Sequence, residues 1–210
     1  MNILPLGDSR VEGGRPEFDS YRFFLWTQLV DAGWEVDFIG NRKDEQTYPK
    51  REDGRCFDTD HQGLGGEVTI GVQETLATLV YKPAPDVVLL GIGGNDLADG
   101  GRSAEETLTS LEEIIVALQT QYPGVSVLVE QIAPGRSDFM TSELTTHFLE
   151  FNAGVGQLAQ QLHTDSTKVI AIDMAAGWGD NLMADQVHYN EAGAQLVADR
   201  YFQAMVEHIR

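Results

Sequence analysis

Asn2-Ile3-Leu4-Pro5-Leu6-Gly7-Asp8-Ser9-Arg10 is the stretch that decides the fold, because an apolar run ends there in a glycine-led turn that carries a serine. A strand over residues 2–6 would deliver Ser9 to the edge of a sheet. Open α/β folds bind their ligands at this carboxyl edge. An Asp-Ser pair after a strand is also an ordinary turn, so the serine has to be judged together with the rest of the chain.

Further β-type runs follow at residues 35–39, 86–90, 126–131 and 168–172. Residues 87–90 and 127–129 are apolar at every position, as in strands that a parallel sheet buries on both faces. Amphipathic segments predict helices near residues 20–32, 68–80, 103–121, 142–163 and 190–208. Ser103 and Glu106 are a candidate capping box for the third of these helices, and Asn190 is a candidate cap for the last. The alternation predicts an α/β fold with five parallel strands and helices on both sides, as a single domain over residues 1–210.

One region does not fit the alternation of strands and helices. Residues 41–61 are charged and rich in turn-forming residues, and they are too long for a routine connection. Such a loop can be a binding wall or a lid, and it can equally be a solvated surface loop.

Charge and composition exclude several classes of partner. The chain has 33 acidic and 14 basic residues, a net charge of -19, so nucleic acid and anionic membranes are not expected to bind. No apolar run approaches the roughly 18 to 20 residues that span a bilayer. Cys56 is the only cysteine, which excludes an internal disulfide. A soluble protein is expected, either cytoplasmic or secreted with a signal peptide outside this chain, and its oligomeric state stays open.

A serine hydroxyl needs a base within hydrogen-bond reach and a third group that orients the base. His188 is the candidate base, and Asp185 precedes it by three residues in Asp185-Gln186-Val187-His188. On one turn this spacing lets the carboxylate meet Nδ1 and leaves Nε2 for Ser9. The alternative is a loop histidine beside a surface aspartate.

Acyl transfer also needs donors for the oxygen that becomes negative. The candidates are the backbone N–H groups of Ser9 and Gly66 and the side-chain amide of Asn95, which lies in Gly93-Gly94-Asn95-Asp96. The run 91–94 lacks the spacing of a dinucleotide fingerprint, and no helix is predicted to open on it.

Four motifs in this order resemble the SGNH or GDSL hydrolase superfamily: Gly7-Asp8-Ser9, Gly66, Gly93-Gly94-Asn95-Asp96 and Asp185-Gln186-Val187-His188. The resemblance implies a flavodoxin-like three-layer α/β/α sandwich with strand order 2-1-3-4-5. It also implies that no cofactor is required and that esters are hydrolysed through an acyl-serine.

Residues 60–66 and the stretch from Asp173 to Gly193 look like carbohydrate esterase family 3, whose members deacetylate xylan. The sequence departs from that pattern at Arg10, a candidate substrate-binding residue that could alter the acyl or leaving-group side of the pocket, and at Tyr189. A short-chain ester on a carbohydrate is the expected substrate. The alternatives are a general carboxylesterase or arylesterase, a lysophospholipase or thioesterase, and a non-catalytic carbohydrate-binding protein of the same fold.

Several neighbours of these motifs have two interpretations each. His61 could line the site or make a structural hydrogen bond, and Trp178 could stack on a sugar or pack on the last helix. Asp8 and Asp96 are expected to order their turns. No metal site is predicted, although Asp58 and Asp60 could contribute to a calcium site and are more simply solvated.

Overall fold

The structure, a computed structural model, describes residues 1–99 and 101–209. The strands are β1 (Asn2–Gly7), β2 (Asp37–Phe38), β3 (Arg42–Lys43), β4 (Asp60–Gly63), β5 (Val87–Gly91), β6 (Ser126–Gln131) and β7 (Val169–Asp173). The helices are α1 (Ser9–Glu12), α2 (Arg22–Asp31), α3 (Thr69–Thr78), α4 (Gly94–Ala98), α5 (Ala104–Gln121), α6 (Ser142–Leu162) and α7 (Glu191–His208), with a 3-10 turn η1 (Asp180–Leu182). The five helices predicted from the sequence are confirmed, and α1, α4 and η1 were not predicted.

The sheet has the order β3-β4-β1-β5-β6-β7, and β2 also pairs with β1. β2 pairs with the start of β1, and β4 pairs with its end. Together these two strands occupy the position next to β1 that was predicted for a single strand. All pairs are parallel except β3 with β4. The α/β class and the order 2-1-3-4-5 are therefore confirmed. The prediction of five strands was wrong, because the sheet has seven strands within the described residues.

Pro5 explains why two short strands, and not one long strand, pair with the edge of β1 that faces away from β5. The carbonyl of Ile3 accepts from Ile39 N–H and that of Gly7 from Leu64 N–H, so alternate residues of β1 face this edge. Pro5 lies between them and has no N–H to offer a neighbour. Neither β2 nor β4 pairs opposite Pro5, because β2 ends its pairing at Ile3 and β4 begins at Leu6.

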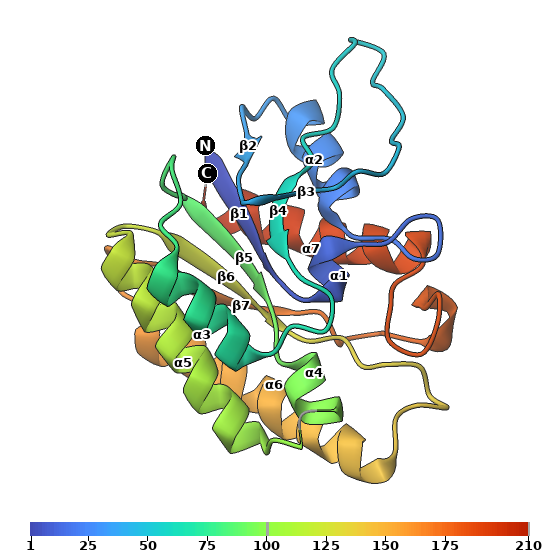
Figure 1. The fold of residues 1–210 in the computed structure, drawn as a ribbon, viewed down its shortest axis with the longest axis vertical. Coiled ribbons are helices and arrows are strands. Elements are labelled where there is room, and N and C mark those ends of the chain that lie inside the picture. The colour runs from blue at the N-terminus through green and yellow to red at the C-terminus, as the bar shows by residue number, and fades with distance from the viewer. Residues whose placement is uncertain (100, 210) are drawn as a thin grey trace.

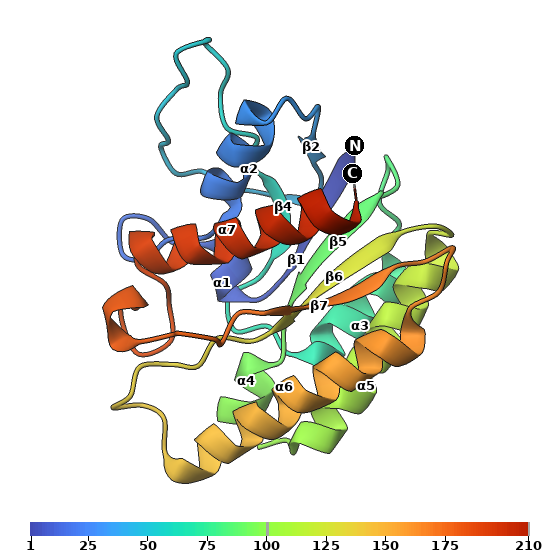
Figure 2. The ribbon, with the colours of Figure 1, turned by 180° about the vertical axis from the view of Figure 1, so that it is seen from behind.

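The sheet is covered on both faces (Figure 1). On one face α3, α5 and α6 bury a cluster with Leu4, Leu90 and Val129 of the sheet. On the other face α2 and α7, seen in front in Figure 2, bury a cluster with Ile3, Leu89 and Leu128. Burial of alternate residues of each central strand on opposite faces accounts for the uninterrupted apolar runs in the sequence.

Side-chain caps set where the long helices begin. Ser103 and Glu106 form the predicted capping box of α5, with Ser103 Oγ accepting from Glu106 N–H at 3.2 Å. Asn190, also predicted as a cap, begins α7 by accepting from Gly193 N–H at 3.0 Å. The cap places α7 directly after the loop that carries His188.

The long segment between β3 and β4 projects beyond α2 and away from α4 (Figures 1 and 2). Tyr48 and Phe57 anchor it, with ring centroids 5.1 Å and 5.5 Å from that of Phe23. In this position the segment does not cover α4, so the structure favours the solvated loop over the lid. None of the helices in the described residues is both long and apolar enough to cross a bilayer.

Candidate active site

Three glycines at the carboxyl edge of the sheet let the site assemble. Gly7 of β1 lies in register with Gly63 of β4 on one side and Gly91 of β5 on the other. A Cβ on Gly7 would lie 1.9 Å from the carbonyl oxygen of Gly91, and one on Gly63 would lie 2.4 Å from the backbone nitrogen of Glu12. Only glycine allows this approach, so the loops after these strands converge at one place.

Ser9 is the first residue of α1, directly after the end of β1. Asp8 orders the turn, because its Oδ1 accepts from Arg10 N–H at 2.9 Å. Asp8 itself is buried, with 7% of its surface exposed. Burial raises the pKa of Asp8, although the neighbouring Arg10 opposes the shift. The expectation that Asp8 orders the nucleophile turn agrees with this contact.

His188 links Ser9 to Asp185. His188 Nε2 lies 2.9 Å from Ser9 Oγ, and His188 Nδ1 lies 2.8 Å from Asp185 Oδ2. The second carboxylate oxygen of Asp185 accepts from the backbone N–H groups of Val187 and His188, each at 2.8 Å. Partial burial raises the pKa of Asp185, but the hydrogen bonds from His188 and the backbone outweigh it, so the pKa lies below its usual value. The carboxylate is therefore ionised at neutral pH.

Arg10 stabilises the loop that carries His188 through hydrogen bonds to backbone carbonyls. Its Nε donates to the carbonyl of Val187 at 2.8 Å, and Nη1 donates to the carbonyl of Ala133 at 2.6 Å. The guanidinium also lies 4.9 Å from the centroid of the Tyr189 ring. Arg10 was predicted to contact substrate, and the structure places it in the wall of the cavity beside Ser9, with these donors directed at backbone carbonyls.

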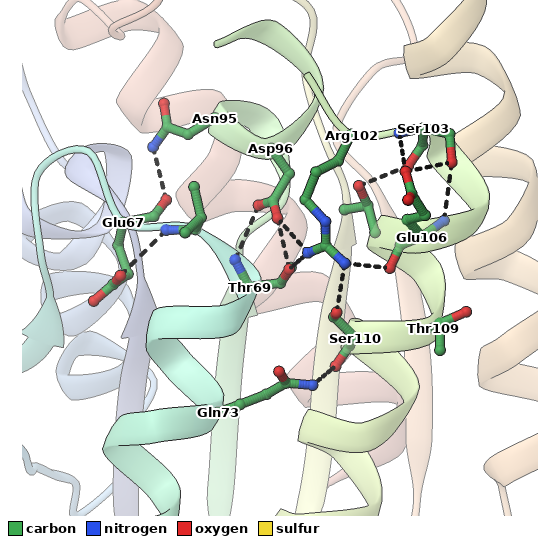
Figure 3. A network of polar contacts seen from close by, with 12 residues as sticks. Glu67, Thr69, Gln73, Asn95, Asp96, Arg102, Ser103, Glu106, Thr109 and Ser110 are labelled. Atoms are coloured by element: carbon green, nitrogen blue, oxygen red, sulfur yellow. Dashed lines mark hydrogen bonds and ion pairs between the residues drawn. The ribbon is translucent and has the colours of Figure 1, made fainter. Parts of the chain in front are cut away.

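On the other side of Ser9, a buried polar network holds Asn95 (Figure 3). Asn95 Nδ2 donates to the carbonyl of Glu67 at 2.8 Å. Asp96 is fully buried and accepts from Thr69 N–H at 2.9 Å, from Thr69 Oγ1 at 2.6 Å and from Arg102 Nη1 at 3.0 Å. The network thus joins the start of α3 to the start of α4, and it bears out the supporting role expected of Asp96.

Gly66 lies on the loop between β4 and α3, next to Glu67. Its φ of +75° is in the left-handed region that favours glycine. Glu12 ties this loop to α1, because its Oε2 accepts from Gly65 N–H at 2.6 Å. The loop of Gly66 is therefore in contact with α4 through Glu67 and Asn95, and with α1 through Gly65 and Glu12.

The helix α4 begins at Gly94, the last residue of the run 91–94. The sequence-based expectation that no helix begins there was wrong. Gly93, with a φ of +113°, makes the turn between β5 and α4, and at five residues α4 gives too weak a periodic signal to recognise.

A small cavity lies beside the serine. Its volume is about 60 Å³, and both Ser9 and Asn95 line it. The rest of the wall is formed by Asp8, Arg10, Gly94, Ala98, Asp99, Gly135, Phe139, Phe148 and Val187. A wider hollow of about 580 Å³ adjoins it and shares Asp99, Phe139 and Val187 with it.

Two residues proposed for substrate contact lie elsewhere. His61 is buried in β4, where its Nδ1 accepts from Gly63 N–H at 3.0 Å, and burial lowers its pKa to about 3. Trp178 packs on Tyr189, at 5.1 Å between ring centroids, and its Nε1 donates to Met183 Sδ at 3.1 Å. Neither residue lines the cavity beside Ser9, so the structural interpretation of each is favoured.

The two aspartates considered for calcium have protein partners. Asp58 Oδ2 accepts from Phe38 N–H at 2.7 Å, and Asp60 pairs with Lys43 Nζ at 2.7 Å. Over residues 1–99 and 101–209, the His, Cys, Asp and Glu side chains form no group of three or more that could hold a metal ion.

Three contacts of the site were not foreseen. Phe18 stacks on His188, Glu12 holds Gly65, and Arg102 completes the network of Asp96. The only signal for Phe18 is an aromatic residue within the polar segment 13–19. The other two are charged side chains in turn regions, which the sequence does not distinguish from solvated charges.

Comparison with protein families gives one match that spans most of the chain. The model of the GDSL-like Lipase/Acylhydrolase family matches residues 6–196. A multidomain esterase of Ruminococcus flavefaciens is 29% identical over 121 residues, which are 50% of this chain and 16% of that protein. The match therefore spans about one sixth of that relative's length.

Solved structures agree over nearly the whole chain. A carbohydrate esterase family 3 protein from Talaromyces cellulolyticus superposes with a TM-score of 0.84 at 28% identity, covering 99% of this chain and 97% of that one. An acetyl esterase, solved as a serine-to-alanine mutant with an acetate ion, has a TM-score of 0.84 at 27% identity with the same coverage.

Proposed function

Because the chain belongs to the GDSL-like lipase/acylhydrolase family and is a carboxylic ester hydrolase, we propose that Ser9 is its nucleophile, with His188 as base. The observation that carries the proposal is the continuous hydrogen-bonded chain from Ser9 Oγ through both ring nitrogens of His188 to Asp185, at 2.9 Å and 2.8 Å. Asp185 orients the imidazole and stabilises its cation. No cofactor enters the proposed reaction.

The reaction has two steps. Ser9 Oγ attacks the ester carbonyl carbon while His188 Nε2 takes the hydroxyl proton, and the tetrahedral intermediate collapses when His188 returns that proton to the departing alcohol. A water molecule then attacks the acyl-serine and gives a proton to His188. That proton returns to Ser9 Oγ as the carboxylic acid leaves, which restores the enzyme.

Three donors are proposed for the oxyanion: Ser9 N–H, Gly66 N–H and Asn95 Nδ2. Asn95 supports this role because it lines the cavity together with Ser9. An amide nitrogen has two hydrogens, and the bond to Glu67 uses one of them. The second hydrogen is available to the reacting oxygen.

An acetyl group is the proposed acyl part of the substrate. The cavity beside Ser9 has a volume of about 60 Å³, which is small against the ~300 Å³ or more of pockets for drug-sized ligands. Ala98, Phe139 and Phe148 give it apolar walls that suit a methyl group. The small volume therefore favours a short acyl chain.

A carbohydrate is the proposed alcohol part. The hollow of about 580 Å³ next to the cavity carries the polar side chains of Asp99, Arg136 and Gln186 along with Phe139. Such side chains can hydrogen-bond hydroxyl groups and stack on a sugar ring. The names of the similar structures, an acetyl esterase and a carbohydrate esterase, support the same assignment.

The test compares acetylated xylan, acetylated monosaccharides, p-nitrophenyl acetate and p-nitrophenyl butyrate as substrates of the wild type, Ser9→Ala and Ser166→Ala. Wild type should release acetate from the sugars and prefer acetate to butyrate. Ser9→Ala should be inactive, and Ser166→Ala, which changes an exposed serine, should be fully active. Undiminished turnover by Ser9→Ala would refute the nucleophile. Faster hydrolysis of the aryl ester than of any sugar ester would instead indicate a general short-chain esterase.

A further inference from the structure

Phe18 contacts the face of the His188 ring. The two ring centroids are 3.9 Å apart and the planes are inclined by 18°, so the rings are stacked. Phe18 lies on the segment between α1 and α2, far in sequence from the loop that carries His188. We propose that Phe18 is a positioning residue for the catalytic base, an inference that rests on the function proposed above.

The segment is held so that Phe18 faces the imidazole. Gly14 and Phe18 exchange backbone hydrogen bonds at 3.3 Å and 3.2 Å, which close the turn between them. Asp19 N–H donates to the carbonyl of Tyr189 at 2.9 Å, which fixes the turn to the residue after His188. Arg15 secures the far side, because it pairs with Asp19 and its guanidinium lies 4.8 Å from the Tyr48 ring centroid.

Gly14 is required for this arrangement. A Cβ at Gly14 would lie 2.5 Å from Phe18 Cε1 and 2.7 Å from Phe18 Cζ. Atoms do not approach that closely, so any larger residue at position 14 has to push the Phe18 ring aside. The glycine therefore allows Phe18 to reach His188.

The stacked ring of Phe18 restrains the orientation of the His188 ring plane, which the two hydrogen bonds of His188 do not fix. The bonds to Ser9 and Asp185 hold the nitrogens of His188 in line, but they leave the ring plane free to tilt about that line. Phe18 covers one face and limits this tilt. When His188 becomes protonated, the electron-rich face of Phe18 also attracts the cation, beside the charges of Asp185, Asp8 and Arg10.

The test is steady-state kinetics of Phe18→Leu and Phe18→Tyr with p-nitrophenyl acetate. Phe18→Leu should lower kcat about three- to tenfold, the size expected for one lost ring contact, and leave KM unchanged. Phe18→Tyr keeps the stacked ring and should retain wild-type kcat. Phe202→Leu, which removes a partly buried ring on α7, is the matched control and should keep full activity.

A second readout is independent of turnover. The ring current of a stacked Phe18 should shift the His188 ring protons upfield in NMR spectra. Phe18→Leu should then move these protons downfield, and Phe18→Tyr should not. Gly14→Ala, which displaces the ring without removing it, should resemble Phe18→Leu in both measurements. Wild-type kcat for Phe18→Leu and Gly14→Ala, or unmoved His188 protons, would overturn the proposal. An active Ser9→Ala variant would refute the proposed function. The His188 proton shifts would still test whether Phe18 stacks on His188.

Discussion

The two sides of Ser9 are held in different ways. On the base side, 51% of the Asp185 side chain and 20% of the His188 side chain are exposed. On the donor side, Asp96 is fully buried, and Thr69 and Arg102 surround it (Figure 3). The base side depends on contacts within and around one surface loop, whereas the donor side is part of the interior.

The difference follows from what each side has to do. In the proposed mechanism His188 exchanges protons with the substrate and with water, so it has to remain accessible. The proposed oxyanion donors would have to point at the developing charge before the reaction begins, which requires a rigid setting. Changes on the base side should therefore lower the rate and spare stability, and changes in the network of Asp96 should lower stability.

The largest effect is expected for His188→Ala. Loss of the base should lower kcat by about 10⁴- to 10⁶-fold, as removal of this member does in other serine hydrolases. Stability should change by less than about 1 kcal/mol because the loop is at the surface. Single-substrate kinetics and urea unfolding measure the two quantities. A large loss of stability in His188→Ala would show that the base side of Ser9 also contributes to the stability of the fold, as the donor side is expected to do.

Asp96→Ala should give the opposite result. Thr69 and Arg102 would lose a buried carboxylate, at a cost of about 3 to 5 kcal/mol in the free energy of unfolding. Urea denaturation checks this loss. Glu112→Ala is the control, since loss of an exposed acid on α5 should change stability by about 0.5 kcal/mol or less. Equal stability of the two variants would contradict the role given to the network.

Asn95→Ala tests whether the donor side serves the reaction itself. Removal of one oxyanion donor should lower kcat by about 10²- to 10³-fold with little change in KM. Asn95→Asp is the companion variant, because it keeps the size and replaces the amide donor with a carboxylate that would repel the oxyanion. An Asn95→Asp variant as active as wild type would show that the side chain does not donate to the oxyanion.

Glu130 gives an effect on stability that depends on pH and leaves both sides of Ser9 intact. It is buried on β6, where it accepts from Tyr201 Oη at 2.7 Å, and burial raises its pKa from 4.5 to about 7. The folded protein binds the proton more tightly than the unfolded chain. The contribution of Glu130 to stability is therefore fully present below about pH 4.5 and lost as the pH rises through about 7.

Glu130→Gln should remove this dependence, because the amide stays neutral and still accepts from Tyr201. The stability of the variant relative to wild type should rise by about 3 kcal/mol between these two pH values and level off above about pH 7. Urea unfolding across pH 4 to 8 provides the curve. Parallel curves for the two proteins would show that Glu130 is not the titrating group.

The helices and central strands could be predicted because their signals are local. The apolar periodicity of residues 103–121 and the Ser103 capping box lie within a few residues of each other, and the structure has α5 there. β4 could not be predicted, because Asp60–Gly63 has neither alternation nor β-branched residues and pairs only where β1 leaves an open edge after Pro5.

The sequence by itself indicated Ser9, Asp185, His188, Gly66 and Asn95, because each motif is a short local pattern and the four motifs occur together in one order along the chain. The distances among them, the stack of Phe18 on His188 and the hydrogen bonds of Arg10 were decided by the tertiary structure alone. Each joins segments from distant parts of the chain. Such contacts depend on how closely the carboxyl ends of the parallel strands lie together. Gly7, Gly63 and Gly91 allow this close packing, and a local sequence pattern does not predict it.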